Sequence, residues 1–333
     1  ANTSGTTIGD SNAVTMASGT TLDLRFSETL GSLAGAGTIT TGSSGAKTLT
    51  VGGLNTDTAF SGVIQNGSGS LLLTKSGTGT LSLTGTNTYT GATVINGGSL
   101  VFENNTASIT TSGFSGSGSL VIRSAGDAFA SAYDFNKTTT GLASLTIGKT
   151  TNTANITISA AQSINGPITI YGGNVDLTAN LNTTGGAAAG DILIKASGDI
   201  ALGLAKTITT TGGDLILWAN SDGGLTNGGV FFDQGSSITT SGGHIWVGGS
   251  VSANSSTTWN GLTVGDGYAV SGKTLTSFGK RGATSIDWHA GVLLDETTIN
   301  SAGGNIYIAA KRNSGAALGA GLINYSGTNG TLI

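Results

Sequence analysis

One short phrase recurs in the second half of the chain and constrains the fold more than any other feature. It consists of an apolar residue between hydroxyl or amide residues, a pair of glycines, and a stretch with strand-like alternation. The phrase occupies residues 207–217, 237–247 and 298–308. A unit of a few short strands and a turn cannot bury its own apolar face, so its recurrence predicts that successive units stack and share one core. The chain is therefore expected to form a repetitive rod.

The spacing of the glycine pairs favours a solenoid over other all-β folds. Asn-Gly steps are typical of antiparallel hairpins, so a sandwich or a barrel is an alternative. The pairs at Gly172, Gly212, Gly242 and Gly303 lie 40, 30 and 61 residues apart. Such gaps suit one or more coils of roughly 20 to 30 residues. A single proline, Pro167, and no sustained period of 3.6 residues also favour long sheets over helices. We expect an all-β chain folded as a solenoid of stacked coils.

The composition excludes several classes of function. Charged residues make up 9% of the chain and the net charge is -4, which leaves no basic surface for nucleic acid. Glycine accounts for 58 of the 333 residues, but the hydrophobic content of 37% falls in alternating stretches that disordered linkers lack. The chain has no cysteine, so disulfides cannot stabilise it. No stretch is long and apolar enough for a membrane span, and no leader opens the sequence.

One stretch resembles a known repeat family. Residues 76–100 contain Gly79-Thr80-Leu81-Ser82-Leu83, then Asn87-Thr88-Tyr89-Thr90-Gly91, and end in Gly97-Gly98-Ser99-Leu100. This order resembles the passenger-associated transport repeat of autotransporter passenger domains, with Ser82 as a small departure from the pattern. The strands between about 160 and 310 are more loosely similar to filamentous-haemagglutinin-type adhesins. Both resemblances imply a right-handed parallel β-helix at the surface of, or secreted by, a Gram-negative-type bacterium, with no catalytic residues to transfer.

The organisation expected from these patterns is one continuous solenoid over 1–333. An autotransporter-repeat-like part covers 1–105, a transition with an extruded loop covers 106–159, and a haemagglutinin-like part covers 160–333. Two segments break the strand rhythm, 124–140 and about 250–287. Both are predicted to be loops that leave the coil, where they either cover the structure or contact a ligand.

Residues suited to catalysis or metal binding are sparse. Asp176, Asp191, Asp199 and Asp214 fall in neighbouring repeats, but an aspartate beside a glycine turn usually caps backbone amides. Glycoside chemistry would need clustered carboxylates, and no pair stands out. His244 and His289 are far apart in sequence, and the glycine-rich steps lack the spacing of a calcium-binding solenoid repeat. We therefore predict that the chain is not an enzyme and binds no metal or cofactor.

The aromatic residues are further candidates for contact with a ligand. Trp218, Trp246, Tyr307 and the pair Phe231 and Phe232 lie in or beside repeat strands, where stacking within the core is the default expectation. The alternative is that Trp and Tyr rings exposed on a flat sheet pack against sugar rings. The residues that we expect on the surface and in contact with a ligand are Trp259, Asp287, Trp288 and His289.

The function predicted from the sequence is that of an extracellular structural and adhesive solenoid. It would mediate attachment of a bacterial cell surface or contact between cells, with a glycan or a surface protein as partner. One alternative is a subunit that self-associates end to end or laterally into a filament or sheath, because open ladder ends expose unpaired strands. A second alternative is a carbohydrate-binding or carbohydrate-active β-helix protein.

Overall fold

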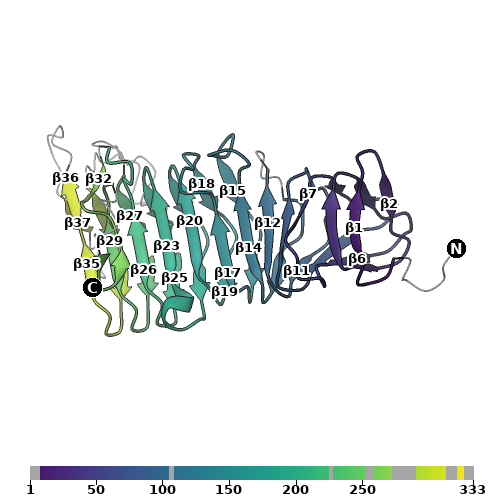
Figure 1. The fold of residues 1–333 in the computed structure, drawn as a ribbon. Coiled ribbons are helices and arrows are strands. Elements are labelled where there is room, and N and C mark those ends of the chain that lie inside the picture. The colour runs from purple at the N-terminus through teal and green to yellow at the C-terminus, as the bar shows by residue number, and fades with distance from the viewer. Residues whose placement is uncertain are drawn as a thin grey trace. The chain divides into compact units, whose positions relative to one another are not determined.

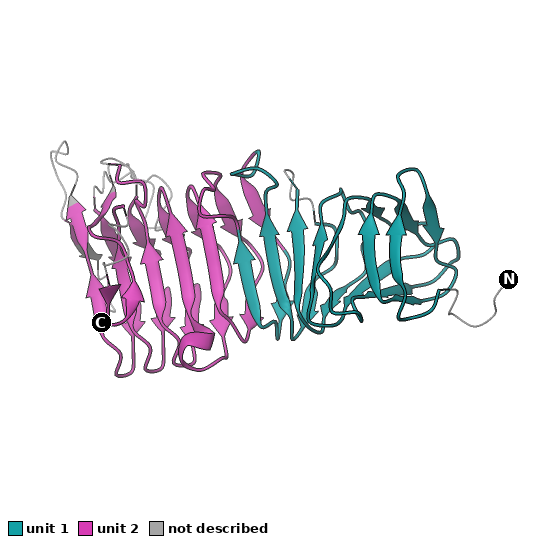
Figure 2. Ribbon diagram, in the orientation of Figure 1, with its two compact units in different colours: residues 1–130, 137–147 teal, residues 131–136, 148–333 magenta. Residues whose placement is uncertain are grey.

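The computed structural model of the chain describes residues 8–104, 109–224, 228–251, 258–271, 290–312 and 321–325. Contacts divide the chain into two compact units, which Figure 2 shows in different colours. Unit 1 comprises Ala1–Ala130 and Lys137–Ile147, and unit 2 comprises Ser131–Asn136 and Gly148–Ile333. The expected division at 105 and 159 within one continuous solenoid stays a prediction.

Unit 1 consists of parallel strands in three sheets, here called A1, B1 and C1. Sheet A1 contains β1 (Ala13–Met16), β4 (Ser32–Gly35), β7 (Thr58–Phe60), β10 (Thr80–Leu83), β12 (Ser99–Glu103), β14 (Ser119–Arg123) and β17 (Ser144–Ile147). Sheet B1 contains β2 (Thr21–Asp23), β5 (Thr38–Thr40) and β8 (Val63–Ile64). Sheet C1 contains β3 (Glu28–Leu30), β6 (Lys47–Val51), β9 (Leu71–Lys75), β11 (Thr93–Ile95), β13 (Phe114–Gly116) and β16 (Thr139–Thr140).

Unit 2 repeats this plan with sheets A2, C2 and D2 (Figure 1). Sheet A2 contains β20 (Ile168–Gly172), β23 (Ile192–Ala196), β26 (Leu215–Trp218), β29 (Ile245–Gly248) and β35 (Ile306–Ile308). Sheet C2 contains β19 (Gln162–Ile164), β22 (Leu181–Thr183), β25 (Thr207–Thr210), β28 (Ser237–Thr239) and β34 (Thr298–Asn300). Sheet D2 contains β15 (Tyr133–Phe135), β18 (Ile156–Ile158), β21 (Val175–Leu177), β24 (Ile200–Leu202), β27 (Val230–Phe232), β33 (Val292–Asp295) and β37 (Leu322–Tyr325).

Two further strand pairs and one short helix complete the described elements. The strands β30 (Thr258–Trp259) and β31 (Leu262–Thr263) form an antiparallel hairpin, and β32 (Ala269–Ser271) pairs in parallel with β36 (Ala310–Arg312). A 3-10 helix, η1 (Ala187–Gly190), joins β22 to β23. In the part of the chain that the structure describes, no helix has the length and apolar character needed to cross a membrane.

The order in which the chain visits the sheets defines a parallel β-helix. In unit 2 each coil passes through A2, D2 and C2 in turn, and every strand pairs in parallel with its counterpart one coil later. In A2, Ile168 pairs with Ile192, Ile192 with Leu215, and Leu215 with Ile245, which are separations of 24, 23 and 30 residues. The predicted parallel β-helix and its coil length are confirmed. The right-handed sense stays a prediction, favoured by the general handedness of parallel crossovers.

Two-residue alternation determines which side chains fill the core. Ile192, Leu215 and Ile245 occupy equivalent inward positions in consecutive coils, and each is fully buried. Burying such a side chain contributes about 1.5 to 3 kcal/mol. The intervening residues point outward, so the outer face of each sheet is defined by the same alternation.

The recurrent glycine phrase forms the turns that follow β25, β28 and β34 in sheet C2. The hydroxyl groups of Thr210, Thr240 and Ser301 each donate a hydrogen bond to the carbonyl oxygen of the glycine three residues later. These hydroxyls are buried, so the bonds satisfy polar groups that water cannot reach. The first glycine of the pair adopts a positive φ, for example +108° at Gly242.

The second glycine of each pair is required by the stacking of coils. A Cβ atom on Gly243 would lie 2.0 Å from the carbonyl oxygen of Gly213. A Cβ atom on Gly304 would lie 2.0 Å from the carbonyl oxygen of Gly243. Consecutive turns approach this closely through their backbone atoms. Each of these turns therefore needs a glycine at the same place, and the phrase recurs from coil to coil.

The two segments predicted as loops differ in how they relate to the coil. Within 124–140, Tyr133 and Phe135 belong to β15, where both side chains are buried and Asp134 between them is exposed. The loop prediction was wrong at these residues because an alternation of only three positions is too short to recognise. Between β29 and β33 the chain makes a long insertion, and β29 pairs directly with β35. The gap of 61 residues between Gly242 and Gly303 is thus one coil with an insertion.

Candidate functional site

The acidic side chains singled out in the sequence stabilise the coils. The Oδ1 atom of Asp191 accepts a hydrogen bond from the backbone N of Asp214 at 2.8 Å, and Oδ1 of Asp214 accepts one from the backbone N of His244 at 2.6 Å. The Nδ1 atom of His244 in turn accepts a hydrogen bond from the backbone N of Asn305 at 2.9 Å. One column of side chains thus links the same position in successive coils.

The other two aspartates lie at sheet D2, Asp176 within β21 and Asp199 directly before β24. Oδ1 of Asp199 accepts hydrogen bonds from the backbone N atoms of Gly228 and Gly229 at 3.0 and 2.9 Å. Asp176 lies at an outward position of β21 in sheet D2. Among the residues that the structure describes, no three His, Asp or Glu side chains are close enough together to hold a metal ion.

An Asp191→Asn variant tests this capping role. Burial raises the pKa of the Asp191 carboxyl, the hydrogen bond from Asp214 N opposes the rise, and the charge of Asp214 adds to it. An acid whose pKa is raised in the folded state stabilises the fold below its unfolded pKa of 3.8, and this contribution is lost as the pH rises through the raised value. Asparagine keeps the acceptor without the charge, so we expect a gain of about 0.3 kcal/mol at neutral pH, small because solvent screens the group.

Urea unfolding at two pH values measures this effect. The advantage of Asp191→Asn should disappear near pH 3. Asp191→Ala, which removes the acceptor, should cost about 1 kcal/mol. Equal stability of the asparagine and alanine variants at neutral pH would show that Asp191 does not act as a cap.

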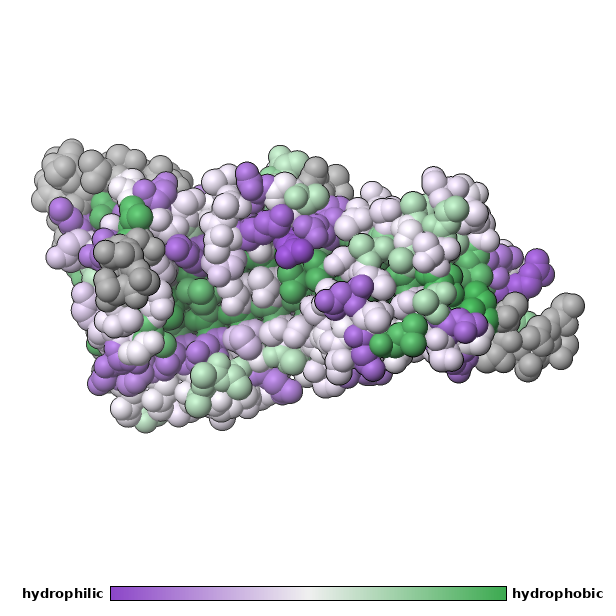
Figure 3. Space-filling view, in the orientation of Figure 1, coloured by the Kyte–Doolittle hydropathy of each residue, from purple (hydrophilic) through white to green (hydrophobic). Residues whose placement is uncertain are grey.

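The outer face of sheet A2 carries a different kind of column. Outward positions that pair across β23, β26, β29 and β35 hold Leu193, Ile216, Trp246 and Tyr307. Figure 3 shows a band of apolar side chains over β23 and β26, bordered by more polar ones. In a solenoid, outward positions are usually solvated and polar, so this apolar column indicates a face that is covered or used for contact.

Two tryptophans form the base of this face. A Cβ atom on Gly248 would lie 2.7 Å from Cζ2 of Trp246, so the absence of a side chain at Gly248 makes room for the indole. Trp218 packs against Trp246 edge to face, with ring centroids 6.1 Å apart. The Nζ atom of Lys195 lies 3.8 Å from the centroid of the Trp218 ring. Burial of Lys195 lowers its pKa.

The insertion after β29 covers these two tryptophans. The Nε1 atom of Trp218 donates a hydrogen bond to the carbonyl oxygen of Ser250 at 2.8 Å, and Val264 packs against the pair. As a result Trp218 and Trp246 are 3% and 1% exposed, although both lie outside the coil. The hairpin turn of the insertion is Asn260-Gly261, with φ of 47° and 82°. This is the hairpin chemistry expected of an Asn-Gly step.

An aromatic surface remains exposed at the edge of the insertion. Tyr307 is 43% exposed and stacks on Trp246, with ring centroids 6.3 Å apart and planes 7° apart. Trp259, which is half-buried, places its ring 5.7 Å from Tyr307 and 5.7 Å from His244. Leu262 and Ile216 are also partly exposed beside the buried cluster. These five residues, Ile216, His244, Trp259, Leu262 and Tyr307, are called the aromatic shelf.

The structure describes one of the four predicted ligand-contact residues. Trp259 lies in the aromatic shelf, whereas Asp287, Trp288 and His289 lie outside the described residues. Stacking of like residues in adjacent coils occurs for Trp246 and Tyr307, but on the outer face and not in the core. The sequence analysis did not single out His244 or Ile216 as surface residues, and it expected Tyr307 in the core by default, with exposure as the alternative. The exposure of Tyr307 could have been predicted from strand alternation, because it lies between Ile306 and Ile308 and so takes the outward position.

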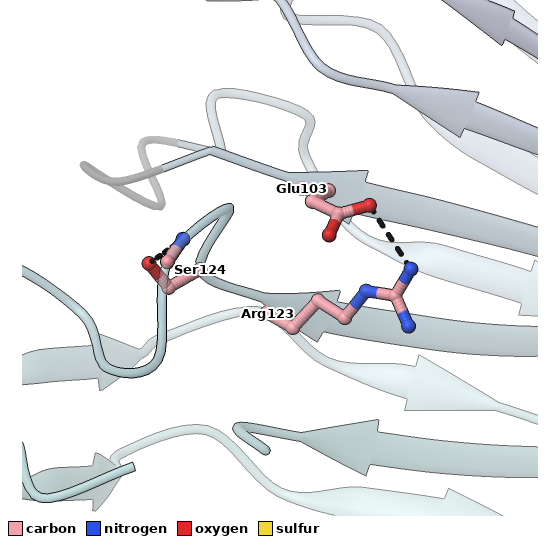
Figure 4. Close-up of polar contacts among 4 residues, drawn as sticks. Glu103, Arg123 and Ser124 are labelled. Carbon is pink, nitrogen blue, oxygen red and sulfur yellow. Dashed lines mark hydrogen bonds and ion pairs between the residues drawn. The ribbon is translucent and has the colours of Figure 1, made fainter. Parts of the chain in front are cut away.

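A charged pair lies on the outer face of sheet A1 in unit 1. The Nη2 atom of Arg123 on β14 lies 3.0 Å from Oε2 of Glu103 on β12 (Figure 4). The two residues pair across the sheet, and both side chains are partly exposed. An ion pair in this setting contributes at most about 1 kcal/mol, so it is a local stabilising contact.

The residues that carried the family resemblance occupy structural positions in unit 1. Oδ1 of Asn87 accepts a hydrogen bond from the backbone N of Ile64 at 2.9 Å. The hydroxyl of Tyr89 lies 2.8 Å from Oγ1 of Thr93, which donates to Oγ1 of Thr111 at 3.1 Å. Tyr89 is 1% exposed, and burial raises its pKa. These side chains satisfy buried polar groups between coils.

A buried lysine also joins neighbouring coils of unit 1. The Nζ atom of Lys75 donates hydrogen bonds to the carbonyl oxygens of Ser76, Gly77 and Gly97 at 2.7, 3.1 and 3.3 Å. Burial lowers the pKa of Lys75, and the charge of Asp57 partly opposes this. The lysine therefore ties a turn of one coil to the turn of the next.

These observations define the class as a parallel β-solenoid whose coils are joined by side-chain caps. A family model for the passenger-associated transport repeat matches residues 73–102, which confirms the repeat expected from the sequence. The chain thus carries a repeat that is typical of autotransporter passenger domains, and this repeat implies secretion through the outer membrane to the surface or medium. The resemblance to filamentous-haemagglutinin-type adhesins receives no support. No curated protein and no solved structure matches the chain.

Proposed function

We propose that the chain is an extracellular structural and adhesive solenoid that attaches a bacterial cell surface to another surface through the aromatic shelf. The exposure of Tyr307 and Trp259 on a face formed by rigid strands is the observation that carries this proposal. Tyrosine and tryptophan are the side chains most enriched where protein surfaces bind partners. Their rings lose little conformational freedom on binding, because Tyr307 is already stacked on Trp246.

The remainder of the coil supports a mechanical role. Capping side chains and inward aliphatic columns recur in successive coils, so stability is built from contacts between neighbours. The acidic residues Asp191, Asp199 and Asp214 accept hydrogen bonds from backbone N atoms, which favours a supporting role over acid or base catalysis. We therefore propose a function without catalysis.

Bead attachment provides the test of this function. Beads coated with the purified chain should attach to bacterial or host cells, and Tyr307→Ala should reduce attachment by about fivefold, as loss of an aromatic contact predicts. Phe26→Ala is the matched control, because Phe26 is 47% exposed but belongs to unit 1. Attachment that is equally strong with Tyr307→Ala and wild type would contradict a role for the shelf. Clumping of coated beads alone would identify a second copy of the chain as the partner.

A further inference from the structure

The geometry points to a neutral saccharide chain as the ligand of the aromatic shelf. This inference rests on the proposed function and specifies its partner. Trp259 and Tyr307 present two aromatic rings with centroids 5.7 Å apart and planes tilted by 46°. Rings arranged in this way offer two adjoining apolar faces, and the C–H faces of pyranose rings pack on such surfaces. A pair of tilted rings is suited to successive sugar units that are rotated relative to each other.

Neutral polar atoms border the rings. Because Nδ1 of His244 accepts a hydrogen bond from Asn305 N, that nitrogen carries no proton, and a neutral imidazole then has its proton on Nε2. Among the described residues, Nε2 of His244 has no hydrogen-bond partner. The centroid of the His244 ring lies 5.7 Å from that of Trp259. The hydroxyl of the exposed Tyr307 and the amide of the exposed Asn305 add a donor and acceptors. Sugar hydroxyls need both kinds of partner.

The charges near the shelf disfavour acidic polysaccharides. Asp214 and Asp191 occupy the same column as His244, one and two coils away, and their carboxylates would repel uronate or sulfate groups. Lys195 on the A2 face has its Nζ over the ring of Trp218. Because this border of the shelf carries negative charge, a neutral saccharide fits better than an anionic one.

Affinity electrophoresis of the full chain tests this inference. Native gels would contain soluble neutral polysaccharides with β-linked glucose, galactose or mannose backbones, and comparison gels would contain polygalacturonate or dextran sulfate. We expect at least one neutral polysaccharide to retard the wild-type chain. Tyr307→Ala should weaken binding by about fivefold, while Tyr307→Phe, which keeps the ring, should weaken it by about twofold or less.

Two further variants separate recognition from folding. His244→Asp keeps an acceptor for Asn305 N, as Asp214 does for the coil before, but it removes the donor and adds a negative charge. It should therefore keep the fold and weaken binding to the neutral polysaccharide. Phe26→Ala should bind like the wild type.

The outcomes distinguish the saccharide from other partners. Retardation by neutral polysaccharides that is lost in Tyr307→Ala supports the inference. Retardation only by the anionic polymers, or retardation that Tyr307→Ala leaves unchanged, would overturn it. If none of the neutral polymers retards the chain but bead attachment still depends on Tyr307, the saccharide inference fails and the adhesive function stands with a protein partner.

Discussion

Replacing Gly243 with alanine is expected to destabilise unit 2 by about 3 kcal/mol, near the upper end of effects seen for single substitutions. The new Cβ atom would lie 2.0 Å from the carbonyl oxygen of Gly213 and 2.5 Å from its carbon. Both are backbone atoms of the preceding coil, so no side-chain rotation can relieve the contact. The strands that flank the turn would have to separate, which would weaken the ladder between neighbouring coils.

Urea unfolding followed by circular dichroism measures this change, and Gly53→Ala supplies the control. A Cβ atom on Gly53 meets nothing within 4 Å, and its φ is not in the left-handed region. This variant should unfold within about 0.5 kcal/mol of the wild type. Wild-type stability of Gly243→Ala would show that the coils are not stacked as closely as the structure has them.

Replacing Tyr89 with alanine is expected to destabilise unit 1 by about 3 to 5 kcal/mol, as deletion of a large buried aromatic side chain does. The ring is 1% exposed, and its hydroxyl belongs to the hydrogen-bonded series with Thr93 and Thr111. Tyr89→Phe removes only the hydroxyl, so it should cost about 1 to 2 kcal/mol because a buried polar partner is left with one bond fewer.

Thermal and urea unfolding of the two variants separates packing from hydrogen bonding at Tyr89. Tyr268→Ala is the control, because Tyr268 is 51% exposed and its removal should change the free energy of unfolding by less than about 0.5 kcal/mol. If Tyr89→Phe and Tyr89→Ala destabilised the chain equally, the hydroxyl and not the ring would be the main contribution. If neither destabilised it, the structural role assigned to the repeat residues would be wrong.

The sequence predicted the architecture because the signals for it are local and repeated. A buried strand face requires the alternation seen from Ile192 to Ile194. A close turn between coils requires the glycine pair at Gly242 and Gly243. Capping by Asp191 and Asp214 could also be anticipated, since an aspartate beside a turn has backbone N atoms within reach. The short strand at Tyr133–Phe135 was missed because three residues carry too little periodicity.

The aromatic shelf could be predicted only in part. Trp259 stood out as an aromatic residue in a segment without strand rhythm, but its neighbours in space come from distant strands. Tyr307 and His244 meet Trp259 because β29 pairs with β35 across an insertion whose path the sequence does not reveal. The burial of Trp218 and Trp246 outside the coil likewise depends on where the hairpin of the insertion folds back.

Because the chain has no cysteine, contact through the aromatic shelf can be tested by labelling of single introduced cysteines. Thr258→Cys places a thiol at an exposed position next to Trp259, and Ala59→Cys places one at an exposed outward position of β7 in unit 1. Maleimide labelling would be timed on coated beads, free and attached to cells. We expect attachment to slow labelling at position 258 and to leave labelling at position 59 unchanged; protection at 59 with free labelling at 258 would contradict contact through the shelf.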